Sequence, residues 1–162
     1  MQLNTLLFLN GLDGISEEKA IERVNGRGNS VSFLAAHLID ARHFIATMLG
    51  SPLPNPIGNA LSNVQNIEDS PSLPLLPVLT SEWTAVSSHL NHILDSPFLV
   101  DLSQPAPHSF PISDSSILGG IAFLVQHDSF HLGQIAFLRR QLGYKAMSYS
   151  QRPPSSSVVV GV

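Results

Sequence analysis

The chain has 162 residues, of which 43% are hydrophobic and only 12% are charged. This composition predicts a single globular domain over residues 1–162 with one substantial core, and it excludes a disordered chain. The formal net charge is −4, and the eight lysines and arginines are scattered apart from Arg139 and Arg140, so we expect no nucleic-acid partner. Because the chain has no cysteine, disulfides and thiolate metal sites are excluded.

The start of the chain is apolar but does not resemble a targeting segment. Residues 1–9 have no basic leader, and Asn10, Gly11 and Asp13 follow too early for a signal peptide. No run of residues approaches the roughly 18 apolar positions of a membrane span. We therefore expect no membrane partner and a cytoplasmic location, which the lack of cysteine also fits.

Two helices are expected in the first third of the chain. The first covers about residues 1–11, and the run from Gly11 to Gly14 ends it; a short extra turn is expected to begin at Ser16, with acidic residues at its positive end. The second covers about residues 30–49, is capped by Asn29 or Ser30, and stops at Gly50.

Two longer helices are expected further along. One covers about residues 74–96, with prolines only in its first turn, and the other covers about residues 114–142 and stops at Gly143. The bundle therefore spans about residues 1–143, and an extended tail follows over about residues 144–162. Strand-like alternation is weak everywhere except at 158–160.

Four helices without a sheet predict an all-α fold, a four-helix bundle. The connections over residues 50–72 and 97–111 are rich in proline and read as irregular. They are longer than antiparallel neighbours need, so at least one is expected to cross the bundle and make consecutive helices parallel.

Two histidines four residues apart, His127 and His131, lie inside the last helix. At about 100° per residue, their side chains leave the helix only about 40° apart and can meet at one cation. They share a stripe with Leu124 and Leu138, so the pair is expected to face the core. A metal held mainly by protein nitrogens usually needs a third protein ligand.

Helical phase selects the third histidine from the five that remain. His37 lies in the inward stripe of the second helix, with the small Ala41 one turn beyond it. His43 is about 240° away on the same helix, and His89 and His92 point away from the core face of the third helix; these three are expected to be solvated. His108, in a proline-rich loop, is not placed.

Other interpretations of these histidines stay open. A single inward histidine is more often a hydrogen-bonded core residue than a ligand, and a metal-free bundle with ordinary core histidines is one reading. Three unpaired buried imidazoles would, however, cost several kcal/mol, which a shared cation removes. The order His127-Asp128-Ser129-Phe130-His131 is close to a zinc-protease motif, but Asp128 lacks the reach of glutamate and no sheet is expected, so a peptidase is improbable.

The chain resembles the DinB-like family of metalloenzymes. The resemblance rests on two motifs, GNSVSFLAAHL at 28–38 and HDSFHLGQ at 127–134, with a similar turn, GLDGISEEK, at 11–19. It covers nearly the whole chain up to about Gly143, and the two motifs together are far more specific than either alone.

The resemblance implies a fold, a site and partners. The family fold is a four-helix bundle in up-down-down-up order with a long second connection. The implied ligands of a divalent ion, commonly nickel or zinc, are His37, His127 and His131, and homodimers are frequent. Relatives of known activity include transferases and isomerases that use a low-molecular-weight thiol such as bacillithiol or mycothiol. With no cysteine in the chain, any such thiol must arrive as cosubstrate alongside the small-molecule substrate.

Two classes of function follow. The first is a metal-dependent enzyme that activates a thiol or water, S-transferase-like or hydrolase-like. The alternative is a non-catalytic binding or stress-response module in which the ion joins two helices. No catalytic residue is assigned: Asp40 is expected beside His37 or in solvent, Asp128 at the surface or next to the site, and Gln134 in hydrogen-bonding range of the site.

Overall fold

The computed structural model describes residues 1–61, 64, 72–96 and 100–150. These residues form helices and contain no β-strand, only an isolated bridge between Pro105 and Ser116, so the all-α prediction is confirmed. The helices are α1 (Gln2–Leu12), α2 (Glu17–Ile21), the 3-10 turn η1 (Val24–Gly26), α3 (Val31–Met48), α4 (Gly58–Leu61), α5 (Leu76–Leu94) and α6 (Ile117–Gln141). The strand-like alternation at 158–160 lies outside the described residues.

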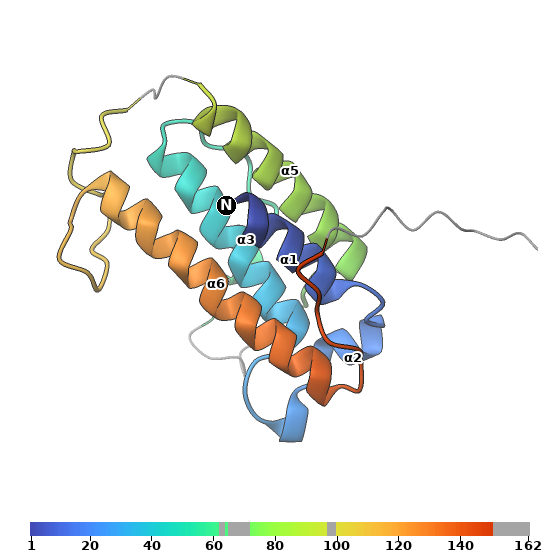
Figure 1. Cartoon of the computed structure of the whole chain (residues 1–162). Helices are drawn as coiled ribbons and strands as arrows, with labels where there is room; N and C mark the ends of the chain where they lie inside the picture. Colours follow the sequence, from blue (N-terminus) through green and yellow to red (C-terminus); the bar gives the residue numbers. More distant parts are fainter. Residues whose placement is uncertain (62–63, 65–71, 97–99, 151–162) are drawn as a thin grey trace, which may run out of the picture.

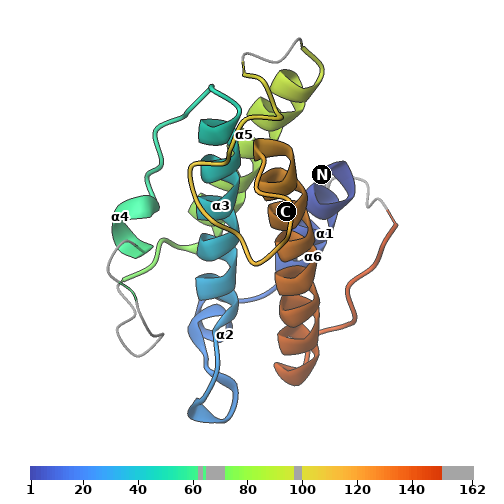
Figure 2. The same cartoon turned by 90° about the vertical axis from the view of Figure 1, so that its left-hand side faces the viewer.

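The four long helices pack side by side, with α3 at the centre of the contacts (Figures 1 and 2). Helices α1 and α6 run in one direction, and α3 and α5 run in the other. Within the parallel pair α1 and α6, Asn4 donates to the Val125 carbonyl and Arg139 donates to the Gly11 carbonyl. Helix α6 also packs against α3 and presents side chains to it.

Polar side chains define where the helices begin. Ser30 accepts a hydrogen bond from the backbone N–H of Phe33, and Ser116 accepts one from Gly119, so α3 and α6 start directly after these serines. The start expected for the last helix, residue 114, was too early, because the cap at Ser116 makes α6 begin at Ile117. Helix α5 has no cap of its own; the Glu17 carboxylate accepts the N–H of Leu76 at 3.0 Å.

Glycines end two of the helices as expected. Gly50 and Gly143 follow α3 and α6 with φ of 76° and 90°, a conformation that side chains with a Cβ rarely adopt.

The connection after α3 is not wholly irregular, since the short helix α4 forms within it. The part of the predicted tail that is described, residues 144–150, lies against the bundle, where Asn10 donates to the Ser148 carbonyl.

The core between α1, α3 and α5 is built around Trp83. Its ring stacks on Phe8 with centroids 4.1 Å apart, and its indole N–H donates to the Thr5 carbonyl. The guanidinium carbon of Arg42 lies 3.5 Å from the Trp83 ring centroid on α5. The side chains of α5 that face this core are buried, namely Leu76, Leu79, Trp83, Val86 and Leu90, whereas Leu94 is 38% exposed.

A buried ion pair crosses the centre of the bundle. Arg42 of α3 contacts Oδ2 of Asp128 of α6 through Nε and Nη2, at 3.1 and 3.0 Å, and both side chains are fully buried. The remaining donors of Arg42 reach Thr5, Ser87 and the Met1 carbonyl. Of the two positions expected for Asp128, the surface is wrong: the side chain directly follows His127 but is buried and paired with Arg42, because α6 packs against both α1 and α3.

His43 is also buried, contrary to the expectation of a solvated side chain. It is 5% exposed, and neither ring nitrogen has a partner in hydrogen-bond geometry within the described part of the chain. The prediction from helical phase assumed that the helix has one buried face. Helix α3 contacts α5, α6, α2 and α4, so it is buried on more than one side. Burial lowers the pKa of His43, the charges of Glu82 and Asp40 and the nearby backbone of Leu53 oppose this, and His89 adds to the lowering.

We expect His43→Leu to make the fold less sensitive to acid. Since the folded pKa of His43 lies below its ordinary value of 6.5, the unfolded chain binds more protons below that pH, and stability falls as pH falls. Urea titrations at about pH 7 and about pH 5 should therefore show a smaller loss of unfolding free energy for His43→Leu than for wild type. The exposed His92→Leu is the control; equal losses in all three proteins would contradict the prediction.

None of the helices in the described ranges is both long and apolar enough to cross a membrane.

Candidate metal centre

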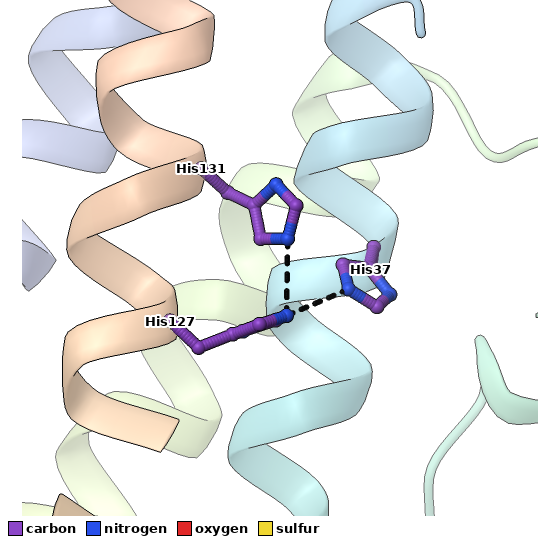
Figure 3. A group of neighbouring side chains, drawn as sticks. All are labelled: His37, His127 and His131. Atoms are coloured by element: carbon purple, nitrogen blue, oxygen red, sulfur yellow. Dashed lines mark hydrogen bonds between the residues drawn. The ribbon is translucent and has the colours of Figure 1, made fainter. Parts of the chain in front are cut away.

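The structure brings His37, His127 and His131 together between α3 and α6 (Figure 3). Nε2 of His127 lies 3.0 Å from Nε2 of His37 and 3.0 Å from Nε2 of His131. One ring nitrogen from each residue lies within 4.8 Å of the other two, and the three side chains are half-buried. In the described part of the chain, this is the one cluster of three or more histidine or acidic residues that could hold a metal ion.

The donor set and its spacing fit a divalent ion. Three imidazole nitrogens are a known ligand set for zinc, with Zn–N bonds of about 2.0–2.1 Å, which place tetrahedral ligand nitrogens about 3.4 Å apart. The observed 3.0 Å separations need only a small outward movement of the rings to reach that spacing. Without an ion, three nitrogens that converge on one point compete for the same protons, since a neutral imidazole has a single N–H.

The electrostatics favour neutral rings. Burial, followed by the neighbouring His131 and His37, lowers the pKa of His127 to about 4. Burial and His131 also lower the pKa of His37, which Asp40 opposes. A metal ligand must be deprotonated, so these imidazoles are available to a cation at neutral pH with almost no competition from protons.

Gln134 orients one of the three rings. Its Oε1 lies 2.7 Å from Nδ1 of His131, one helical turn away on α6. With the proton on Nδ1 donated to this oxygen, the lone pair of His131 is on Nε2 and points at the other two histidines. Gln134 therefore lies in the position expected for it from the sequence. Nδ1 of His127 is buried and has no partner among the described residues.

The other candidates lie elsewhere. Asp40 accepts a hydrogen bond from the Asn55 amide at 2.6 Å, and no described hydrogen bond links it to His37. His89 is half-buried and hydrogen-bonded to the Ser51 carbonyl at 2.8 Å, so it is not the solvated side chain expected. His92 is exposed, as predicted, and His108 is exposed and packs its ring beside Phe44.

A cavity of about 460 Å³ opens beside the histidines, and we call it the site cavity. Its walls are Pro111, Ile112, Phe123, Gln126, His127, Phe130 and His131. The loop before α6 supplies the first two of these. Gly120 allows this loop to approach, because a Cβ there would lie 2.5 Å from the Phe110 ring. The site cavity is therefore apolar on the side away from the histidines.

Sequence reasoning missed these walls. Phe123 and Phe130 lie one turn before and one turn after His127, and the same helical phase that selected the histidines places them on the edges of the stripe. The sequence could not predict that Pro111 and Ile112 line the cavity, because a loop has no periodicity that indicates its position in space.

A sequence model of the DinB family matches residues 7–152. No curated protein and no solved structure matches the chain.

Proposed function

Because the chain belongs to the DinB family, we propose that it binds a divalent metal ion through His37, His127 and His131 and acts as a metal-dependent enzyme. The proposed reactions are transfer of a low-molecular-weight thiol or hydrolysis. The proposed ion is nickel or zinc, since the available donors are imidazole nitrogens and both ions accept them. A small molecule is the proposed substrate, and a homodimer in the cytoplasm is the expected state of the protein.

The histidines, Gln134 and two phenylalanines would each have a role in this function. The three neutral imidazoles supply nitrogen lone pairs, and Gln134 holds the His131 proton on Nδ1 so that Nε2 faces inward. A divalent ion bound by three imidazoles acts as a Lewis acid and lowers the pKa of a bound water or thiol. Phe123 and Phe130 give the same space apolar walls against which the apolar part of a substrate can pack.

The site cavity is the observation that favours an enzyme over a structural metal. His127 and His131 form part of its wall, so a substrate there would lie against the ligands. A purely structural ion is normally enclosed by four protein ligands. Within the described ranges, the cluster has three candidate ligands and no fourth. This arrangement supports an open position for a substrate or water.

The test begins with the metal content of the wild-type chain purified without a nickel column. Elemental analysis should give about one divalent ion per chain, and removal by a chelator should lower the melting temperature by about 5–10 °C, because a ligand that binds only the folded state stabilises it. A metal-free chain whose melting temperature does not respond to added nickel or zinc would contradict the proposal.

The activity is tested separately. The metal-loaded chain is incubated with a low-molecular-weight thiol and a generic electrophile, and with an ester for hydrolysis. Product formation that disappears on chelation and returns with the ion supports an enzyme. Full metal content with neither activity favours the non-catalytic module.

A further inference from the structure

A second cavity lies next to the site cavity along α6. It has a volume of about 550 Å³ and lies between the last turns of α6 and the loop around η1; we call it the distal cavity. Its walls are Val24, Asn25, Arg27, Gly28, Asn29, Leu34, Phe130, Gly133, Gln134, Phe137 and Leu138. Phe130 is common to both cavities and is 63% exposed. The two cavities therefore adjoin at Phe130, and we call them together the groove.

The two ends of this groove differ in charge. Among the described residues, no lysine, arginine or carboxylate lines the site cavity, whose walls are mainly aromatic and aliphatic. The described wall of the distal cavity has one charged residue, Arg27, and no acidic residue. Asn25, Asn29 and Gln134 add polar groups beside it. The distal cavity thus combines a positive charge and amide groups with apolar side chains such as Phe137 and Leu138, whereas the site cavity is mainly apolar beside the histidines.

Arg27 is available to a ligand. Its side chain is exposed, and in the described part of the chain no ion pair or hydrogen bond engages its guanidinium. The neighbouring Arg23 is different, because its Nε donates to the Gly28 carbonyl and holds the loop. A guanidinium presents parallel N–H donors that match a carboxylate or phosphate in two-point contact.

The distance between the two ends sets the size of the ligand. His127 and Gln134 are seven residues apart on α6, which corresponds to about 10 Å along the helix axis. A molecule that occupies both cavities must therefore extend along α6. Its middle would pass Phe130, whose ring packs edge-on against His131 with centroids 5.1 Å apart.

We propose that the groove binds an elongated anionic amphiphile, with its apolar end in the site cavity and its carboxylate on Arg27. The inference rests on the proposed function only in placing the reaction at the three histidines. Recognition of the anion by Arg27 does not require the metal. It assigns Arg27 and Phe130 as specificity-determining residues, one for the charge and one for the apolar body.

The test compares two probes of equal length and different charge, octanoate and octanamide. Titration calorimetry on the wild-type protein should show tighter binding of octanoate. Arg27→Gln should weaken octanoate binding about threefold to tenfold and leave octanamide unchanged, as expected for an exposed charge-assisted contact. Phe130→Ala should weaken both probes. Lys145→Gln, which removes one exposed positive charge outside the groove, is the matched control and should retain the preference.

The outcomes separate this inference from the proposed function. Metal content is measured on the same samples. If the Arg27→Gln variant still binds octanoate more tightly than octanamide, the inference is overturned even when the metal is present. The same holds if neither probe binds the wild-type protein. If the preference depends on Arg27 in a chain that holds no metal, the groove stands and the proposed function fails.

Discussion

Replacing His37, His127 or His131 with alanine should reduce the bound metal at least tenfold. Each substitution removes one of three nitrogens that converge at 3.0 Å separations, and two remaining imidazoles hold an ion far more weakly. Elemental analysis of each variant, together with the melting temperature in the presence and absence of added ion, measures the effect. The metal-dependent rise in melting temperature should disappear in the same variants.

The control substitutions are His92→Ala and His89→Ala. His92 is exposed, and His89 is engaged by Ser51, so neither should change the metal content. His37 is the decisive position, because it is the only candidate ligand on α3 and lies 90 positions from His127 in the chain. Unchanged metal in His37→Ala would mean that the ion, if present, is held by α6 alone.

Replacing Asp128 with alanine should destabilise the fold by about 3–5 kcal/mol. The substitution leaves the Arg42 guanidinium fully buried without its carboxylate, and an uncompensated buried charge is among the most costly defects in a core. Burial raises the pKa of Asp128, and the charge of Arg42 and its hydrogen bonds oppose that rise. Urea unfolding of the chain at neutral pH gives the free energy directly.

A double variant distinguishes a lost pair from a lost cavity wall. Arg42→Met with Asp128→Leu replaces both charges by apolar groups of similar size and should recover most of the stability. Glu22→Ala, which breaks the exposed contact between Glu22 and Lys19, should change stability little. A double variant as unstable as Asp128→Ala would show that the hydrogen bonds to Thr5 and Ser87 matter more than the charges do.

The buried pair also bears on the metal centre. Asp128 directly follows His127, and Arg42 lies just over one turn beyond His37 on α3, so the pair joins the same two helices as the histidines. The pair connects α6 to α3. The histidines meet between the same two helices (Figure 3). In the double variant, metal content reports whether this alignment depends on the charges or on packing alone.

Much of the site was accessible from the sequence because helices have a regular period. The spacing of His127 and His131 and the phase of His37 depend only on residues of one helix at a time. The same regularity placed Gln134 beside His131, where the structure has it. The family resemblance, carried by two motifs on these helices, is confirmed by the match over residues 7–152.

Predicting burial from helical phase failed where a helix has more than one buried face. His43 was expected in solvent, and the surface was one of the two positions expected for Asp128, because a single core-facing stripe was assumed. In the structure, α3 is covered on several sides and α6 on two. The partner of Asp128 is 86 positions away in the chain, and only the packing of α3 against α6 brings Arg42 to it.

By itself, the sequence determined the all-α class, the four long helices and the faces on which three histidines lie, since these follow from local periodicity and capping. Only the tertiary structure decided that the three rings meet, that a buried ion pair lies next to them, and that two loops complete a groove with Arg27 at one end. The reason is physical: each of these features joins segments distant in the chain, and their positions depend on how the helices pack and not on the conformation of any one of them.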